Sequence, residues 1–218
     1  RTHVPVVTTL MGVDVLPSAH GLRVGMIGTY GNRWANLAMR DADCILALGA
    51  RFDVRQTGAD LDVFRAGKTI IKVDVDKGQL DWRLPADIAI LGDIGAFLGE
   101  AIAETSAIEW PDRSEWSAAL ATYRTDWPDV AELGEIKGIN PAELMRFVSE
   151  SMKSASAVVA DVGQNQMWAA QSIHLSPGQR FITSGGMGAM GFALPAAIGV
   201  AQAAVGRPVL VVAGDGGM

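Results

Sequence analysis

The chain has 218 residues, of which 49% are hydrophobic and 19% are charged, a balance that can fill a sizeable core and argues against a disordered chain. Lys and Arg total 18 against 24 Asp and Glu, so the formal net charge is −6. No basic cluster interrupts this acidity, and we therefore expect no nucleic-acid partner. Cys44 is the single cysteine, which excludes an internal disulfide and is typical of a reducing compartment such as the cytoplasm.

The longest uncharged apolar stretch covers residues 187–201 and is shorter than the ~20 residues of a membrane-spanning helix. It contains Pro195 and several glycines, and we interpret it as a buried helix. No basic-then-apolar leader opens the sequence. We therefore expect neither a membrane anchor nor a signal peptide.

In chain order, short apolar runs rich in β-forming residues alternate with segments of helical pattern. In the first half, the predicted strands are 4–9, 44–48, 69–74 and 88–91, and the predicted helices are 33–42 and 94–105. Strands that are apolar on both faces and separated by helices indicate a parallel sheet covered on both sides. The sequence therefore predicts an α/β fold whose first doubly wound unit covers residues 1–105.

Glycines and acidic residues lie after or between the strands of this unit. The segments are 25–32, 49–53 and 74–76, and all would fall along one sheet edge. Such loops can cradle a nucleotide, with Arg51 available for a phosphate and Asp74 or Asp76 for a ribose hydroxyl. Ordinary turns use the same residue types, so the residues alone leave both interpretations open.

Residues 106–139 differ in character from what precedes them. They are mostly acidic, and Trp-Pro-Asp at 110–112 and 127–129 and glycines between 134 and 138 punctuate them. We predict one helix here, near residues 116–124. We interpret the segment as a linker.

A second α/β unit is predicted over residues 140–218. Asn140 suits a helix N-cap, Pro141 suits the first helical position, and Glu143 completes a capping pattern. The predicted strands are 157–160, 180–184 and 208–213, with a small-residue helix over 191–205. The chain is thus predicted to hold two doubly wound parallel-sheet units.

The last predicted strand runs into Gly214-Asp215-Gly216-Gly217. This places one carboxylate at the carboxyl edge of a sheet, where open α/β sheets bind ligands. Flanking glycines let the backbone turn and direct N–H groups at an anion, and a carboxylate with phosphate oxygens is a typical Mg²⁺ ligand set. For the tetrapeptide alone, a plain turn after a strand is an equally good interpretation.

Two other segments follow strands of this unit and open helices. Residues 161–170 include Gly163-Gln164-Asn165 and offer helix N-terminal N–H groups and amide side chains to a phosphate. Residues 184–192 hold four glycines, which permit close approach of the backbone to a flat ligand. Taken singly, each segment is also consistent with ordinary capping or core packing.

Taken together, these three motifs resemble the cofactor domain of thiamine-diphosphate enzymes, and the acetolactate synthase group most of all. The resemblance implies that Gly163, Gln164 and Asn165 hold the diphosphate and that Asp215 binds Mg²⁺. It also implies that Met190 bends the cofactor. Further contacts implied by the resemblance are Gly188 at the aminopyrimidine and Gly214, Gly216 and Gly217 at the diphosphate turn. Asn165 stands where most of the group have His.

The first unit resembles the central domain of the same group in residues 35–39, 42–53 and 56–58. That domain binds FAD in a structural, non-redox role. The flavin neighbours implied by the resemblance are Gly25, Gly28, Gly49, Arg51, Asp74 and Asp93. Ile27 replaces a His common in the group, and the loop over 29–34 is longer, and both departures fall on the expected flavin contact.

A dinucleotide site is the main alternative. Residues 186–191 satisfy G-x-G-x-x-G after a predicted strand, and Asp215 ends the next strand, where such a fold has a ribose-binding acid. The spacing leaves open a NAD- or FAD-binding module without lyase activity. The glycines on both sides of Asp215 and the upstream segment 163–166 favour the metal-diphosphate interpretation.

The resemblance implies a carboligase acting on 2-oxo acids, with pyruvate converted to 2-acetolactate for branched-chain amino acid synthesis, in a homo-oligomeric full-length enzyme. Another thiamine-diphosphate decarboxylase or carboligase is the alternative. In the group, the activating Glu belongs to a domain before these residues, and a second metal ligand follows Met218. We therefore expect the 218 residues alone to lack activity and to bind thiamine diphosphate weakly.

Overall fold

The computed structural model describes residues 2–218 and shows an α/β protein whose strands pair in parallel. The strands are β1 (Val6–Thr8), β2 (Arg23–Met26), β3 (Cys44–Leu48), β4 (Thr69–Asp74), β5 (Ile88–Leu91), β6 (Ala157–Ala160), β7 (Arg180–Thr183) and β8 (Val209–Val212). The helices are α1 (Arg33–Asp41), α2 (Val54–Thr57), α3 (Leu61–Arg65), α4 (Lys77–Asp81), α5 (Ile94–Glu104), α6 (Ser114–Asp126), α7 (Asp129–Glu132), α8 (Pro141–Ser151), α9 (Gln164–Ser172) and α10 (Ala193–Ala203). Two 3-10 turns complete the elements, η1 (Leu10–Gly12) and η2 (Asp215–Gly217).

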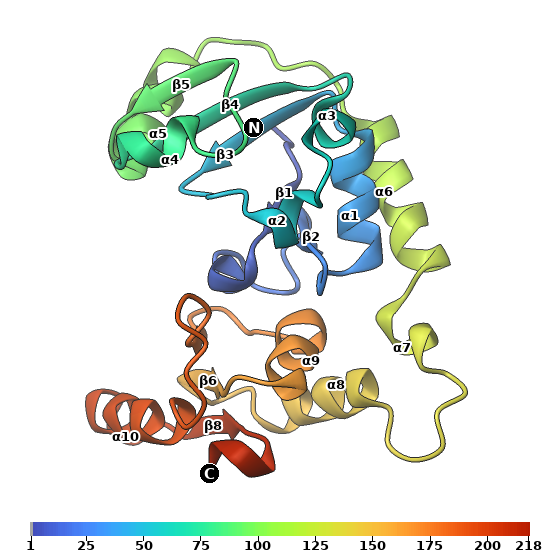
Figure 1. The fold of residues 1–218 in the computed structure, drawn as a ribbon, viewed down its shortest axis with the longest axis vertical. Helices are drawn as coiled ribbons and strands as arrows, with labels where there is room; N and C mark the ends of the chain where they lie inside the picture. Colours follow the sequence, from blue (N-terminus) through green and yellow to red (C-terminus); the bar gives the residue numbers. More distant parts are fainter. Residues whose placement is uncertain (1) are drawn as a thin grey trace.

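The predicted α/β class with parallel strands is confirmed. In the first half of the chain, the strands form a pair, β1-β2, and a three-stranded sheet, β3-β4-β5, rather than one sheet (Figure 1). Val7 and Val24 of the pair nevertheless pack against the same buried cluster as Ile45 and Ile70. The two sheets of this unit therefore share one core.

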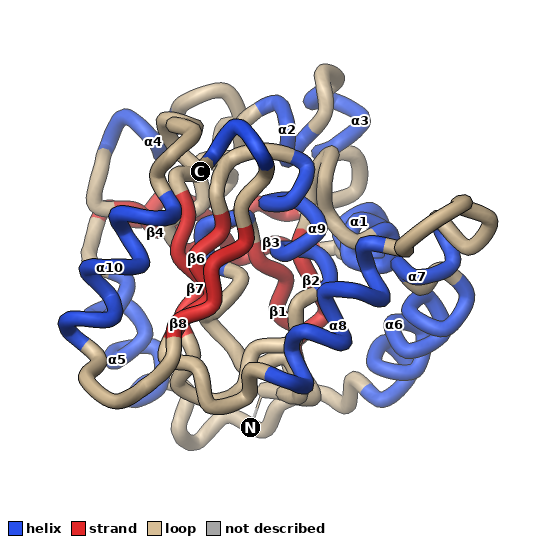
Figure 2. Tube along the Cα trace, turned by 90° about the horizontal axis from the view of Figure 1, so that it is seen from below, coloured by secondary structure: helices blue, strands red, loops and turns tan. Residues whose placement is uncertain are grey.

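The second unit is a three-layer arrangement around the order β7-β6-β8. Figure 2 shows α10 on one side of this sheet and α8 and α9 on the other. The residues of β6 alternate accordingly, because successive side chains of a strand point to opposite faces. Val158 and Ala160 join the cluster with α9, whereas Ala157 and Val159 join the cluster with α10. β6 is buried along its whole length.

Several predicted elements differ from the structure in detail. Gly25 and Met26 were expected in a loop but are the last residues of β2, a short strand that a charge and a glycine make hard to recognise. The segment 106–139 holds two helices, α6 and α7, where one was expected. Residues 187–201 are not one buried helix: the first part is an exposed loop, and α10 exposes Leu194 and Ile198. Within the described part of the chain, no helix is long and apolar enough to cross a membrane.

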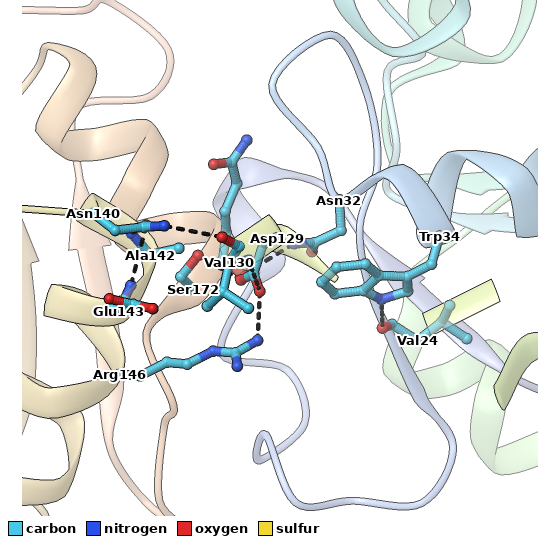
Figure 3. A network of polar contacts seen from close by, with 11 residues as sticks. Val24, Asn32, Trp34, Asp129, Val130, Asn140, Ala142, Glu143, Arg146 and Ser172 are labelled. Carbon is cyan, nitrogen blue, oxygen red and sulfur yellow. Dashed lines mark hydrogen bonds and ion pairs between the residues drawn. The ribbon is translucent and has the colours of Figure 1, made fainter. Parts of the chain in front are cut away.

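The segment after α6 is fixed to the second unit by a buried carboxylate. Asp129 accepts hydrogen bonds from Arg146 on α8 and from Ser172 Oγ on α9, the latter at 2.6 Å (Figure 3). Asn140, the predicted N-cap of α8, accepts from Ala142 N at 2.9 Å and donates to Val130 O at 2.9 Å. These bonds join α7, α8 and α9, so the end of the predicted linker is part of the packed second unit.

Replacing Asp129 tests this anchor. Asp129→Ala leaves the buried Ser172 hydroxyl and the Arg146 guanidinium without their acceptor. We expect the free energy of unfolding to fall by about 2–4 kcal/mol, somewhat less than for a fully buried ion pair because Arg146 is partly exposed. Urea unfolding measures the change, with Asp126→Ala, an exposed carboxylate on α6, as the control. Equal stability of the two variants would contradict the role of Asp129.

Candidate functional site

The carboxyl ends of three parallel strands meet at one edge of the second sheet. β6 leads into residues 161–163, β7 into the glycine-rich loop 184–191, and β8 into residues 213–217. Asp161 N donates to Val212 O at 2.8 Å, which holds the ends of β6 and β8 together. The parallel order therefore brings all three predicted cofactor motifs to the same edge.

Asp161 is the centre of this edge, and the sequence analysis did not single it out. Its side chain is completely buried. Oδ1 accepts from Val162 N at 2.7 Å, and Oδ2 accepts from Gly191 N at 2.9 Å, so the carboxylate ties the end of β6 to the end of the glycine-rich loop. A Cβ atom on Gly217 would overlap Oδ2, so only glycine fits there without movement. The available sequence signal was a carboxylate directly after a buried strand and two residues before a glycine.

Asn165 strengthens the same junction. Its Nδ2 donates to Asp161 O at 2.9 Å and to Val212 O at 3.0 Å, so the amide nitrogen is committed to the ends of β6 and β8. A Cβ atom on Gly163 would overlap Asn165 Oδ1, and Gly163 has φ 154°, a conformation that favours glycine. The visible role of the Asn165 side chain is thus to set the shape of the edge.

The N-terminus of α9 is the main anion-binding element of the edge. Gly163 precedes the helix, and Gln164 is its first residue and is exposed. The first N–H groups of a helix have no intrahelical acceptor and carry a partial positive charge. A phosphate group placed here would accept these hydrogen bonds without any lysine or arginine.

Asp215 is the first residue of η2 and is exposed, and its neighbour Gly214 packs beside Asn165 in the first turn of α9. Gly216 is also exposed, whereas Gly217 is buried and donates its N–H to Gly214 O at 3.1 Å. No group of three or more His, Cys, Asp or Glu in the described residues could hold a metal on its own. Asp215 therefore offers one carboxylate, and the remaining ligands of a cation would come from phosphate oxygens or from elsewhere.

The glycine-rich loop leaves its predicted contact residues open to solvent. Met190 is 69% exposed, and Gly188 is exposed with φ 71°. Gly191 also has a left-handed backbone, with φ 80°, and its N–H donates to Asp161 Oδ2. The loop is fixed at Gly191, while Met190 stays available for a ligand.

The strand order argues against the dinucleotide alternative. In that fold, the glycine-rich loop and the ribose-binding acid follow neighbouring strands. Here β7 precedes the glycine-rich loop and β8 precedes Asp215, but β6 lies between them. The two features that satisfied the motif by spacing are therefore two strands apart.

The predicted nucleotide residues of the first unit gather mainly at the carboxyl edge of β3-β4-β5. Gly49 N donates to Val73 O at 2.9 Å, and Gly92 N donates to Asp74 O at 3.0 Å. Asp93 follows and caps α5 by accepting from Ala96 N at 2.9 Å. Arg51 is exposed at this edge, where it pairs with Asp53 at 3.0 Å and lies 5.8 Å from the Trp82 ring. The structure thus brings Gly49, Arg51, Asp74 and Asp93 to one edge.

Gly25 and Gly28 belong to the other sheet of this unit and are both packed. A Cβ atom on Gly25 would lie 2.7 Å from Asn32 Oδ1. Gly28 has φ 107°, and a Cβ there would lie 2.8 Å from Arg55 O. The Asn36 side chain accepts from Gly28 N at 2.8 Å and donates to Gly28 O at 2.9 Å. The structure shows a packing reason for both glycines, and their contact with a flavin stays a prediction.

Comparison with known proteins gives a family for both units. Residues 1–101 match the thiamine pyrophosphate enzyme central domain, and residues 161–218 match the thiamine pyrophosphate enzyme C-terminal TPP binding domain. The chain belongs to the thiamine pyrophosphate enzymes. Thiamine pyrophosphate is another name for thiamine diphosphate, the cofactor of the predicted site. The second match contains every predicted cofactor residue of the second unit.

The relatives are large subunits of acetolactate synthases. The chain is 36% identical to the acetolactate synthase large subunit of Lactococcus lactis and to the isozyme 1 large subunit of Escherichia coli, over 100% of its length in both cases. It is 37% identical to the large subunit of Parasynechococcus marenigrum, over 99% of its length. The chain spans 37%, 38% and 34% of these relatives, respectively. The predicted membership of the acetolactate synthase-like group is confirmed.

We expect substitutions of Asp161 and Asp215 to differ in their effect on the free energy of unfolding. Asp161→Asn keeps the side-chain volume but replaces one acceptor by a donor, so either Val162 N or Gly191 N loses its partner in a buried place. We expect a loss of about 1–3 kcal/mol in the free energy of unfolding. Asp215→Asn changes an exposed side chain and should stay within about 0.5 kcal/mol of the parent chain.

Urea unfolding at neutral pH measures both variants, and hydrogen exchange of the Gly191 amide reports the local bond. A stable Asp161→Asn chain with an unchanged Gly191 amide would show that the buried carboxylate does not hold the loop.

Proposed function

We propose that the carboxyl edge of β7-β6-β8 binds the diphosphate of thiamine diphosphate with Mg²⁺, and that Asp215 is a ligand of the metal. The observation behind the proposal is the combination of a free helix N-terminus and an exposed carboxylate on adjoining loops. The N–H groups at Gln164 and Asn165 suit phosphate oxygens. Mg²⁺ commonly uses one or two carboxylates together with phosphate oxygens and water.

The residues of this chain would bind and orient the cofactor rather than transfer protons. Met190, exposed on a loop that is fixed at Gly191, would contact the rings of the bound cofactor and help to orient them, a positioning effect. Asp161 and Asn165 would hold the edge in shape from behind. When bound, thiamine diphosphate supplies an electron sink for bond cleavage next to the carbonyl of a 2-oxo acid.

The activity of the whole protein is a further part of the proposal. The large-subunit names of the relatives support carboligation of 2-oxo acids, with two pyruvate molecules giving 2-acetolactate and CO₂, in a homo-oligomeric enzyme of the cytoplasm. A different thiamine-diphosphate decarboxylase or carboligase is the second candidate. Product analysis of the complete gene product with pyruvate separates the two candidates, because a simple decarboxylase releases acetaldehyde instead of 2-acetolactate.

We propose no counterpart of the group's activating Glu among these 218 residues. We therefore expect the 218-residue chain alone to form no 2-acetolactate.

The metal proposal is tested by thiamine diphosphate binding to the complete gene product. We expect affinity to depend on Mg²⁺ and to fall at least about tenfold in Asp215→Asn, the loss expected for one charged ligand. Asp126→Asn removes an exposed carboxylate from α6 and should bind as the parent protein does. Calorimetry with Mg²⁺ or with EDTA measures all three proteins. Unchanged binding in Asp215→Asn would rule out Asp215 as the metal ligand.

We also propose that the edge of β3-β4-β5 binds the diphosphate part of FAD, with Arg51 as the phosphate contact. The support is the convergence of Gly49, Arg51, Asp74 and Asp93 at one edge. The complete gene product is expected to retain flavin absorbance after gel filtration, and Arg51→Gln is expected to retain less. Lys137→Gln, which removes a positive charge from an exposed loop, is the control. Absence of flavin from the parent protein would contradict the proposal without touching the thiamine diphosphate site.

A further inference from the structure

A cavity of about 170 Å³ lies at the amino ends of β1 and β2, beneath α6. Its lining includes Pro5, Arg23, Trp34, Ser117, Leu120 and Arg124. The strands present their amino ends here, whereas the two proposed cofactor edges are formed by carboxyl ends. This cavity is therefore separate from both of them.

Arg23 enters the cavity from β2 with an unused donor. Its Nη2 donates to Val13 O at 3.3 Å, but its Nε is buried and has no hydrogen-bond partner among the described residues. A buried donor without an acceptor costs free energy, so it is normally paired with protein, water or a ligand. The guanidinium of Arg23 thus lacks an acceptor on the side of Nε.

Arg124 adds a second positive charge from α6. Its guanidinium carbon lies 5.7 Å from the centre of the Trp34 ring, and the indole N–H of Trp34 is already used, donating to Val24 O at 2.7 Å (Figure 3). In the described part of the chain, neither Arg23 nor Arg124 forms an ion pair with a carboxylate. Burial, and then repulsion from Arg124, lowers the pKa of the Arg23 guanidinium from its ordinary value.

The surroundings supply no compensating negative charge. No acidic side chain lines the cavity. Asp129, an acid of the neighbouring network, is engaged by Arg146 and Ser172. Burial, followed by the positive charges of Arg146 and Arg124, lowers the pKa of His174. Two arginines therefore face one cavity with no anion of the chain between them.

We propose that this cavity binds a small oxyanion, a carboxylate or a phosphate, between Arg23 and Arg124. The planar guanidinium presents a fork of donors that matches carboxylate and phosphate oxygens, and charged hydrogen bonds of this kind are among the strongest in proteins. Ser117 adds a hydroxyl donor, and Leu120 and Pro5 give the remaining wall an apolar character. The cavity is several times the roughly 30 Å³ that one water takes in the liquid, so it has room for such an anion. The site is independent of the proposed cofactor chemistry.

The test follows the side chains of the cavity by NMR of the 218-residue chain. Inorganic phosphate and propionate are the two probes, titrated at constant ionic strength with chloride as the balancing anion. The Arg Nε–H resonances of Arg23 and Arg124 and the indole N–H of Trp34 report on the site. We expect saturable shifts of these resonances with phosphate, with propionate or with both, and the arm that saturates identifies the class of anion.

Variants separate the site from general charge effects. Arg124 is exposed at the mouth of the cavity, so Arg124→Gln should fold normally and weaken anion affinity about tenfold, as expected for a lost charged hydrogen bond. Lys137→Gln removes the same charge from an exposed loop outside the cavity and should leave affinity unchanged. Arg23→Gln should abolish binding, and its retained fold is checked from the amide spectrum.

Two results would overturn the proposal. One is the absence of saturable shifts with both anions in the parent chain. The other is equal anion affinity in Arg124→Gln and Lys137→Gln, which would show that the shifts come from charge screening at the surface.

Discussion

A buried carboxylate holds the functional edge of this protein together. Asp161 sits where β6 ends, and its two oxygens accept backbone N–H groups from its own turn and from the glycine-rich loop after β7. Burying a charged group without a cation is costly, and hydrogen bonds to the charged form are the available compensation. Gly191 has a left-handed backbone, and a Cβ atom on Gly217 would overlap the Asp161 carboxylate. The glycines around the site are therefore constrained by the carboxylate as well as by any ligand.

The same constraint separates residues that shape the site from residues that are free to bind. Asn165 and Gly217 use their polar atoms within the edge, whereas Asp215 and Met190 are exposed. Residues held by internal hydrogen bonds, with exposed residues above them, are the arrangement expected when a protein must hold a charged ligand in a fixed position. The first unit is packed onto this unit as well: Val13 and Met26 join the core that contains β6 and α9, and Asn32 Nδ2 donates to Gln171 O at 3.1 Å.

The sequence predicted the strands well where the hydrophobic pattern was strong. β3, β4, β5 and β6 begin and end where they were expected, because each is a short apolar run between polar turns. β2 was missed, since Arg23 and Gly25 break the pattern and its burial comes from contacts with Asn32 and Trp34. The helices α2 and α3 have four and five residues and depend on the caps Asp53 and Asp60, which local patterns did not reveal.

The candidate site could likewise be predicted only where local sequence patterns carried the signal. The three motifs were recognised from local composition, and the parallel strand order explains why they meet. The hydrogen bonds of Asp161 join residues far apart in the sequence, and Arg23 and Arg124 line one cavity from distant elements. Neither arrangement could be predicted from local patterns. The dinucleotide alternative was left open by spacing, and it was the order β7-β6-β8 that argued against it.

The most direct measurement is anomalous diffraction from crystals of the complete gene product grown with thiamine diphosphate and Mn²⁺ in place of Mg²⁺. The account predicts one metal peak at coordinating distance from the Asp215 carboxylate, with the diphosphate against the N-terminus of α9. A metal peak away from Asp215, or a diphosphate that does not touch the α9 N-terminus, would contradict it.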